Sequence, residues 1–294
     1  MAEASARDEP EGRRGPDGLL LIDKPPGVTS HDAVDRIRRA LGTRKVGHAG
    51  TLDPLATGLL LVGVGRATRL LRFLGDLPKV YVGTGRLGVE TTTLDADGEV
   101  VREAAVEVNE DMLRAAMTRF VGDIEQVPPA YSAVKVGGRK LYQSARQGRA
   151  VVAPPRRVRV ETFELLRLER PRFEFLVRCS SGTYVRSLVA DVGRELGPGA
   201  HLVALRRTAI GPYRVEDATT PDAPGRLVPL ERAAGHLQAI DLTEDEARAA
   251  AHGSILGPAG IDGPYRVRGP DGRLIGIYSD RGAKAVPEVI LAPA

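Results

Sequence analysis

The sequence predicts an α+β fold built from hairpin-linked strands and amphipathic helices. Strands are indicated where apolar and polar residues alternate, as over residues 158–168 and 173–179. Helices are indicated where apolar residues recur every three or four positions, as over residues 112–120 and 185–196. The turn at Asp97-Gly98 is typical of a hairpin between antiparallel strands. The 294 residues suffice for one large domain, or for a large domain and a small one.

The first third of the chain alternates between short strands and helices. Ser30 can cap a helix that ends at Gly42, with Asp32 in its first turn, where the helix dipole favours a negative charge. Apolar or alternating runs predict the strands, and a short apolar period after Gly65 predicts a second helix. The expected strands cover residues 19–22, 59–64 and 80–84, and the second helix covers residues 66–73.

The rest of the chain contains two clear helix starts and a change of composition. Asn109 can cap the helix over 112–120, and Thr243 with Glu246 forms a capping box. Strands are expected at 91–94, 99–101 and 201–207, and a hairpin at 265–278 turns around Asp271-Gly272. Residues 221–226 are rich in Pro, Gly and Asp and are typical of a linker.

Composition limits the class of protein. The 42 Lys and Arg against 38 Asp and Glu give a net charge of +4. Residues 1–17 lack the apolar core of a signal peptide, so we expect a disordered tail. No apolar run is long enough to cross a membrane. A single cysteine, Cys179, fits a reducing cytoplasm, and the scattered His residues give no metal-ligand spacing.

Residues 124–155 differ from their surroundings. They lack a long apolar period and interleave basic residues with tyrosine, among them Tyr131, Arg139, Lys140 and Tyr142. This pattern suits a clamp for nucleic acid, and a mobile surface loop is the alternative. We expect a loop-like insertion with a short helix over residues 141–147. Further clusters of arginine, such as Arg66, Arg69 and Arg72, suggest a basic face for a polyanion or an ordinary solvated surface.

Residues 45–58 combine a cation, a histidine, a carboxylate and turn glycines before a hydrophobic run. Asp53 precedes Pro54, which disfavours helix, so Asp53 should lie on an irregular loop. Functional residues are concentrated on such loops. The alternative is a turn in which Asp53 satisfies its own backbone.

Residues 47–58, Gly-His-Ala-Gly-Thr-Leu-Asp-Pro-Leu-Ala-Thr-Gly, resemble the catalytic motif of the TruB family of tRNA pseudouridine-55 synthases. The family more often has Thr where this chain has Ala49. A second stretch, residues 181–188, Ser-Gly-Thr-Tyr-Val-Arg-Ser-Leu, is similar to another motif of the family. The resemblance implies a mixed, mostly antiparallel central sheet flanked by helices, the pseudouridine synthase fold. It also implies a small PUA-like β-barrel at the C-terminus.

The resemblance also implies domains and site residues. The catalytic domain would cover 18–240, with 124–155 as its RNA-gripping insertion, and the PUA-like domain would cover 241–294. Asp53 would be the catalytic nucleophile. His48, Tyr81, Tyr184 and Leu205 would bind the substrate, with Tyr81 stacking on the extruded uracil and relaying a proton. Arg186 and Lys24 would support the site.

The implied reaction converts uridine 55 of the tRNA T loop to pseudouridine, an isomerisation that requires no metal or cofactor. We expect a monomer that binds the T-arm stem-loop without a membrane or an obligate protein partner. One alternative is a non-catalytic tRNA-binding or RNA-folding module, which could lack Asp53. Another is a phosphate-handling enzyme, suggested by the glycine-rich residues 63–68, but these lack the Gly-Lys-Ser/Thr ending of a P-loop.

Overall fold

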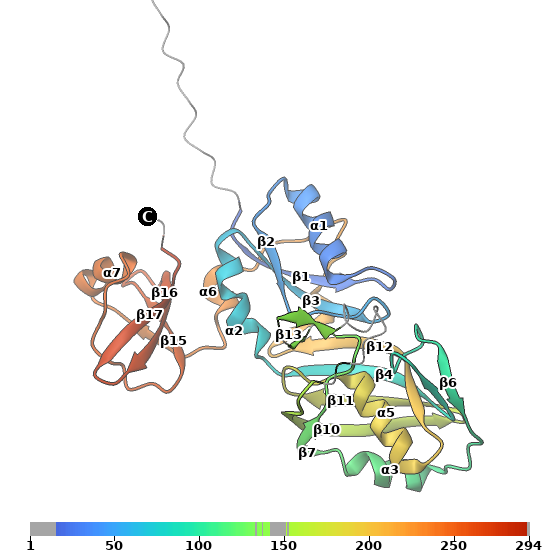
Figure 1. Ribbon diagram of the computed structural model, residues 1–294. Coiled ribbons are helices and arrows are strands. Elements are labelled where there is room, and N and C mark those ends of the chain that lie inside the picture. The colour runs from blue at the N-terminus through green and yellow to red at the C-terminus, as the bar shows by residue number, and fades with distance from the viewer. Residues whose placement is uncertain (1–15, 133, 137, 142–150, 152, 293–294) are drawn as a thin grey trace, which may run out of the picture.

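The computed structural model describes residues 16–132, 134–136, 138–141, 151 and 153–292 (Figure 1). Its main feature is a nine-stranded sheet in which β3 and β12 run parallel and the other neighbours run antiparallel. The predicted α+β class with a mostly antiparallel sheet is therefore confirmed. In order across the sheet, the strands are β1 (Gly18–Lys24), β3 (Thr57–Val64), β12 (Ala200–Ile210), β4 (Lys79–Leu87), β11 (Arg172–Cys179), β10 (Arg156–Glu169) and β7 (Gly122–Gln126), with β2 (Val46–Ala49) beside β3 and β13 (Tyr213–Arg214) beside β12.

Helices cover this sheet in separate groups (Figure 1). Beside β4, β10 and β11, the helices α3 and α5 bury an apolar core that includes Phe173 and Phe175. Beside β1 and β3, α1 buries Val34 and Ile37 against a second core. The helices are α1 (Ser30–Leu41), η1 (Gly65–Leu70), α2 (Leu71–Gly75), α3 (Glu110–Thr118), α5 (Val185–Leu196), η2 (Val215–Asp217), α6 (Leu230–Ala233) and α7 (Glu244–Ala251).

The start of α1 differs from the prediction. Thr29, not Ser30, is the N-cap: its side chain accepts a hydrogen bond from the backbone N–H of Asp32, and the Asp32 carboxylate accepts one from the N–H of Thr29. Two neighbouring hydroxyl residues can both cap a helix, and the reciprocal bonds with Asp32 select Thr29. The predicted end at Gly42 is correct, since Gly42 adopts the left-handed conformation.

The predicted insertion, residues 124–155, is only partly loop-like. Its first residues belong to β7, which pairs with β10 in the central sheet. A two-stranded hairpin follows, made of β8 (Lys135–Val136) and β9 (Arg139–Lys140). The helix expected over 141–147 lies almost wholly outside the described residues. Another hairpin, β5 (Val89–Thr91) with β6 (Val100–Glu103), occurs where the Asp97-Gly98 turn predicted one.

The C-terminal part contains a four-stranded sheet, in the order β14 (Ala239–Asp241), β15 (Pro264–Arg268), β16 (Leu274–Arg281) and β17 (Lys284–Ile290). The Thr243 capping box opens α7 as expected. Tyr265 and Tyr278 are fully buried in the core of this part. In the described residues, β14 and β17 are not paired with each other, so the strand assignments do not close the predicted barrel.

Three arginines that the sequence suggested for a polyanion contact the C-terminal sheet. Arg66, Arg69 and Arg72 follow one another at three-residue intervals along η1 and α2 and donate hydrogen bonds to backbone carbonyls at the end of the chain. The acceptors are the carbonyl oxygens of Leu291 at 2.5 Å, Ile290 at 2.7 Å and Glu288 at 2.9 Å. These guanidinium groups therefore serve an internal contact.

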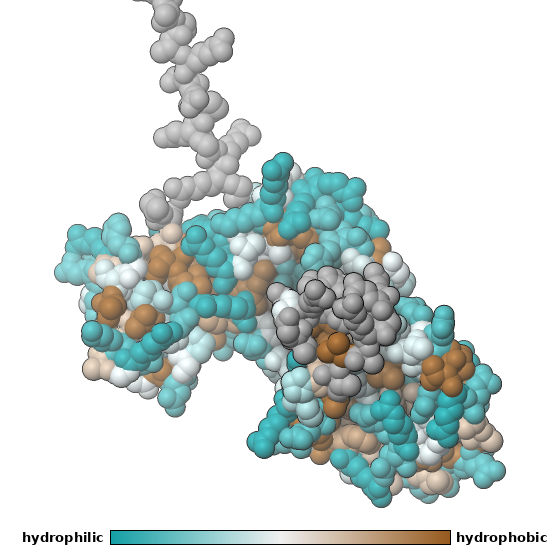
Figure 2. All heavy atoms as spheres, viewed as in Figure 1, coloured by the Kyte–Doolittle hydropathy of each residue, from teal (hydrophilic) through white to brown (hydrophobic). Residues whose placement is uncertain are grey.

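An apolar core lies behind these hydrogen bonds. It joins Leu70 and Leu74 of η1 and α2 to Ile277 and Leu291 of the C-terminal part. In the space-filling view, the C-terminal part is a lobe on the left whose visible surface mixes hydrophilic and hydrophobic groups (Figure 2). Removing this lobe would expose the apolar side chains that it covers.

We expect Leu291→Ala to destabilise the whole protein. Leu291 is 1% exposed and lies in the core shared by both parts, so truncation leaves a cavity there. Large-to-small changes of this kind cost about 2–5 kcal/mol. The measurement is urea unfolding, with Leu166→Ala as control, because Leu166 is 49% exposed and its truncation should cost no more than about 0.5 kcal/mol. Equal effects in the two variants would contradict a shared core.

Candidate active site

The loop over residues 50–56 is fixed to the protein by its main chain. The Leu52 N–H donates to the Ser30 hydroxyl at 2.9 Å, and this hydroxyl donates to the Leu52 carbonyl at 3.2 Å. Ser30 is 1% exposed, so these bonds form away from water. The residue that was expected to cap α1 therefore ties the first turn of the helix to the loop that carries Asp53.

Lys24 also holds this loop in place through its side chain. Its side chain is fully buried, and the ammonium group donates to the carbonyl oxygens of Val28 at 2.7 Å, Pro25 at 3.0 Å and Pro54 at 3.3 Å. Burial lowers the pKa of Lys24 to about 8, while the nearby Asp53 carboxylate raises it. Lys24 thus contacts the backbone next to Asp53.

Arg207 is a third anchor, which the sequence did not indicate. It is 1% exposed and donates to the carbonyl oxygens of Leu59 at 2.7 Å and Gly50 at 3.0 Å. Its backbone lies directly against Gly58, where φ is +99° and a Cβ atom would meet the Arg207 carbonyl. Only glycine allows both this conformation and this approach. The parallel crossing of β3 and β12 therefore depends on the last glycine of the motif.

Asp53 opens into a cavity of about 290 Å³. Tyr81 from β4, Tyr184 and Arg186 at the start of α5, and Leu205 from β12 line the same cavity. Five of the seven residues predicted for the site are thus brought together from four segments. The remaining lining residues include Gly50, Thr51, Leu52, Ala56, Gly75, Lys79, Ser132, Ser180, Gly182, Thr183, Val185 and Arg207.

Arg186 joins two carboxylates. Its guanidinium lies 3.3 Å from a carboxylate oxygen of Asp53 and 3.5 Å from one of Asp95. It also donates to the carbonyl oxygens of Tyr131 at 2.6 Å and Thr93 at 3.3 Å. The Arg186 side chain is 5% exposed, so these groups must compensate its charge within the protein. The structure adds Asp95 to the site, a residue that the sequence showed only as part of a turn.

The Asp53 side chain is 47% exposed toward the cavity. In the described part of the chain its carboxylate accepts no hydrogen bond from its own loop, so the alternative of a self-satisfied turn is not what the structure shows. Partial burial raises the pKa of Asp53 above the ordinary value, Arg186 lowers it, and Asp95 raises it. The carboxylate is therefore partly desolvated, and a buried cation orients it.

The other walls are aromatic and apolar. Tyr81 is 8% exposed, and burial raises the pKa of its phenol, which keeps the hydroxyl protonated at neutral pH. The backbone of Tyr184 is fixed by a buried side chain, because Gln126 donates to its carbonyl at 3.0 Å and accepts from its N–H at 2.7 Å. Gln126 is a contribution of β7 that the sequence did not reveal. Leu205 is half-buried and contacts the main apolar core.

His48 lies outside the lining of the cavity. It is on β2, where its ring meets the ring of His31 edge-on with centroids 5.4 Å apart. Burial, and next the positive charge of His31, lowers the pKa of His48 to about 4, so its ring is neutral at physiological pH.

Lys79, in contrast, lines the cavity although the sequence gave no sign of it. It is 5% exposed, and burial lowers its pKa to about 8.

Within the described ranges, no three His, Cys, Asp or Glu side chains gather as metal ligands would. None of the helices in those ranges is long and apolar enough to cross a bilayer.

Comparison with known proteins defines the family. Residues 38–185 match the N-terminal domain model of the TruB family of pseudouridylate synthases. Residues 186–223 match a tRNA pseudouridylate synthase B C-terminal domain, and residues 237–292 match the C-terminal domain of tRNA pseudouridine synthase II. A fold and a cavity of this kind, with these matches, define a uridine-isomerising class of enzyme.

The chain belongs to the TruB family of pseudouridylate synthases. It is 47% identical over 289 residues to tRNA pseudouridine synthase B of Thermobifida fusca, covering 94% of this chain and 99% of that protein. It is 45% identical over 287 residues to tRNA pseudouridine synthase B of Mycobacterium tuberculosis strain H37Rv, covering 94% and 96%. The family predicted from the two motifs is therefore confirmed.

Solved structures agree with the fold. A chain in a Cbf5-Nop10-Gar1 complex superposes with a TM-score of 0.73 at 28% identity, over 94% of this chain and 84% of that one. A chain in an H/ACA ribonucleoprotein bound to a substrate RNA containing 2′-deoxyuridine gives 0.71 at 27% identity, over 94% and 85%.

We expect Asp95→Asn to lower the stability of the fold and to slow the formation of pseudouridine. Asparagine keeps an acceptor for Thr93 but loses the charge that faces buried Arg186. Removing one partner of a buried charged contact costs about 1–3 kcal/mol, and a displaced Arg186 should orient Asp53 less well. Thermal melting and pseudouridine formation are the measurements. Asp97→Asn is a matched control, because Asp97 is exposed two residues away; the same loss there would contradict a specific Asp95–Arg186 contact.

Proposed function

We propose that this protein converts uridine 55 in the T loop of tRNA to pseudouridine, with Asp53 as the nucleophile. The observation that carries the proposal is the contact between Asp53 and buried Arg186 in a cavity walled by Tyr81, Tyr184 and Leu205. The names of the relatives, tRNA pseudouridine synthase B, support tRNA as the substrate.

The reaction moves one bond within the nucleotide. The bond between N1 of uracil and C1′ of ribose breaks, a bond from C5 to C1′ forms, C5 loses a proton and N1 gains one. An ionised carboxylate is needed to add to the sugar or to the base. Arg186 favours this ionised form and holds its direction, whereas desolvation increases its reactivity toward a bound nucleotide. No oxidation or reduction is involved.

The aromatic walls suit a base removed from its stack. A uridine must leave the T loop to reach Asp53, which costs a few kcal/mol. Stacking on Tyr81 offsets part of this cost, at about 1–3 kcal/mol per base. A phenol that stays protonated can relay the C5 proton by giving up its own as it accepts another. Tyr184 and Leu205 restrict the base to one plane, and His48, neutral and outside the cavity, would contact the loop from which the base leaves.

We also propose that residues 18–240 form the catalytic domain, residues 241–294 a PUA-like RNA-binding domain, and residues 1–17 a tail. The protein would act in the cytoplasm as a monomer, without partner proteins of the kind present in the Cbf5-Nop10-Gar1 complex. The alternative of a non-catalytic tRNA-binding or RNA-folding module is disfavoured, because it would not need an Asp53–Arg186 contact.

We expect Asp53→Asn to abolish turnover by many orders of magnitude and to leave tRNA binding near the wild-type level. Asparagine keeps the size of the side chain but loses the charge and nearly all nucleophilicity. Because burial makes the folded pKa of Asp53 higher than the unfolded one, the ionised carboxylate costs stability at neutral pH. The same change removes one of the two carboxylates that face buried Arg186, which costs stability. The two effects oppose each other, so the melting temperature of the variant should stay close to that of the wild type.

The assay is release of label from C5 of uridine in a T-arm hairpin, combined with filter binding and a circular dichroism melt. Asp97→Asn controls for loss of a carboxylate near the site. Substantial release by the Asp53 variant, with the fold intact, would return the assignment to an RNA-binding module or to another catalytic group.

We expect Tyr81→Phe to bind RNA like the wild type and to turn over far more slowly, whereas Tyr81→Leu should lose both. The phenylalanine ring keeps the stacking face, and the leucine removes it along with the hydroxyl. Hairpin affinity and single-turnover rates separate the two contributions. Wild-type turnover by the Phe variant would show that the hydroxyl takes no part in the chemistry.

A further inference from the structure

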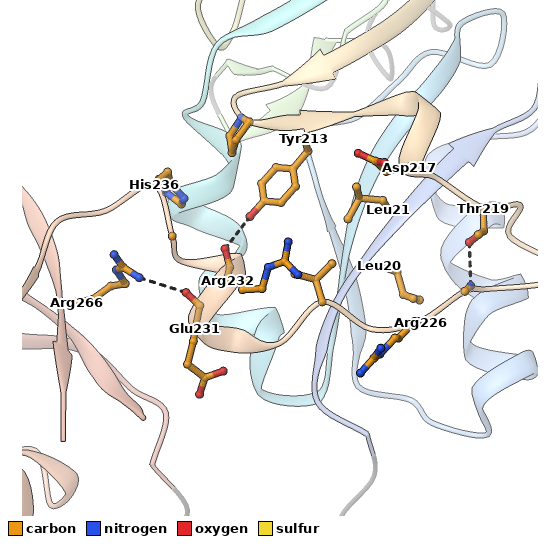
Figure 3. A pocket seen from close by; sticks show the side chains of 14 residues that line it. Leu20, Leu21, Tyr213, Asp217, Thr219, Arg226, Glu231, Arg232, His236 and Arg266 are labelled. Carbon is orange, nitrogen blue, oxygen red and sulfur yellow. Dashed lines mark hydrogen bonds between the residues drawn. The ribbon is translucent and has the colours of Figure 1, made fainter. Parts of the chain in front are cut away.

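A second cavity lies between the catalytic sheet and the C-terminal sheet (Figure 3). It has a volume of about 710 Å³ and shares no lining residue with the cavity at Asp53. One wall comes from β1 and the turn between β12 and β13, and the other from residues 225–236 and β15. Cavities of this size at domain junctions are a common place for ligands.

The inner wall is apolar and held in place. Leu20, Leu21, Pro212 and Val228 contribute to it, together with the ring of Tyr213. The Tyr213 hydroxyl donates to the Ala233 carbonyl at 2.9 Å and to the Arg232 carbonyl at 3.4 Å, which fixes the ring against the end of α6; Figure 3 draws the contact with Arg232. A rigid aromatic ring beside aliphatic side chains is a surface on which a planar group can lie.

Positive side chains lie on the opposite wall. Figure 3 shows Arg232 extending from α6 across the cavity, with Arg226 on the same segment. Within the described part of the chain, neither guanidinium forms a hydrogen bond or has a carboxylate within 4.0 Å. Arg266 adds a third charge, but its side chain is occupied by the carbonyl oxygens of Leu237 at 2.9 Å and Glu231 at 3.3 Å.

His236 and two carboxylates complete the wall. Both ring nitrogens of His236 are buried without a hydrogen bond of good geometry, and burial lowers the pKa of the ring, so it is neutral. Asp217 and Glu231 also line the cavity. Their negative charges disfavour a ligand with several phosphates and offer acceptors to hydroxyl or amino groups.

We propose that this cavity binds one nucleotide unit, with its phosphate between Arg226 and Arg232 and its base against Tyr213. Guanidinium groups match phosphate oxygens in geometry and charge, and an aromatic ring accepts any base by stacking. The carboxylates of Asp217 and Glu231 and the neutral ring of His236 are then available for hydrogen bonds with the ribose and the edge of the base. An inorganic anion would leave the apolar wall uncovered, and an apolar ligand would leave two arginines unpaired.

The nucleotide has two sources, a residue of the bound RNA or a free mononucleotide. β12 carries Arg207 at the catalytic cavity and ends at Ile210, beside the turn that lines this one, so on the order of 10 Å of strand separates the two along β12. An RNA engaged at Asp53 would reach this cavity if its backbone followed the surface over this stretch. Only this first source rests on the proposed function.

The test is the double variant Arg226→Gln/Arg232→Gln in the full chain. The control is Arg167→Gln/Arg248→Gln, which removes the same charge from side chains that are 62% and 76% exposed and far from the cavity lining. Because the substituted side chains of Arg226 and Arg232 are exposed, the variants should fold, and a circular dichroism melt checks this. Arg226→Gln alone serves if the double variant melts early.

Filter binding with full-length tRNA and with a T-arm hairpin tests the first source, and calorimetric titration with AMP and UMP tests the second. We expect at least a tenfold loss of affinity, relative to the control, for full-length tRNA if the unit belongs to RNA, or for the mononucleotides if it is free. Affinities of the double variant equal to those of the control for every probe would overturn the proposal. Turnover on the hairpin is measured in parallel: its absence from the wild type would refute the proposed function and leave the mononucleotide result valid.

Discussion

The burial of the Arg186 guanidinium is the constraint on which the site depends. A charge that is 5% exposed must be met by opposite charges and carbonyl oxygens, or the fold loses several kcal/mol. Asp53, Asp95, Thr93 and Tyr131 meet this need from three parts of the chain that are distant in sequence. Compensating one cation therefore brings the motif loop, the β5–β6 hairpin and the segment after β7 to the same point.

Two buried cations near Asp53 have backbone carbonyls, and not carboxylates, as their hydrogen-bond partners. Lys24 and Arg207 are fully buried, yet both donate to backbone carbonyls instead of carboxylates. Carbonyl oxygens satisfy the hydrogen bonds but leave the positive charge in place. Together with Lys79, these groups give the cavity an electropositive interior of low dielectric, which suits a substrate whose backbone is anionic.

Much of this could be predicted from the sequence, and the failures have a common cause. Helix periodicity and the caps at Asn109 and Thr243 are local, and they are correct. The family resemblance indicated five residues that line one cavity, and three of them, Asp53, Tyr184 and Arg186, lie in the two motifs. Asp95 was missed because its partner lies 91 positions away.

The other failures are also tertiary. Thr29 and Ser30 are equally good caps by composition, and only the contact with Leu52 shows what Ser30 does. The sequence indicated Arg66, Arg69 and Arg72 only as a basic cluster. Their hydrogen bonds to backbone carbonyls could not be predicted, because a carbonyl acceptor is present in every residue and is not marked by any residue type. The short strands β14 and β17 depend on partners in the same way.

The arginine row on η1 and α2 has a mechanical consequence. Three successive attachments, two on β17 and one at Leu291 just after it, are backed by shared apolar packing and hold the C-terminal lobe against η1 and α2. An RNA that touches both lobes meets two surfaces at a fixed separation and must supply any bending itself. RNAs that already have the required curvature then bind with little loss of conformational entropy. RNAs that must bend to touch both lobes bind more weakly, because the bending costs free energy.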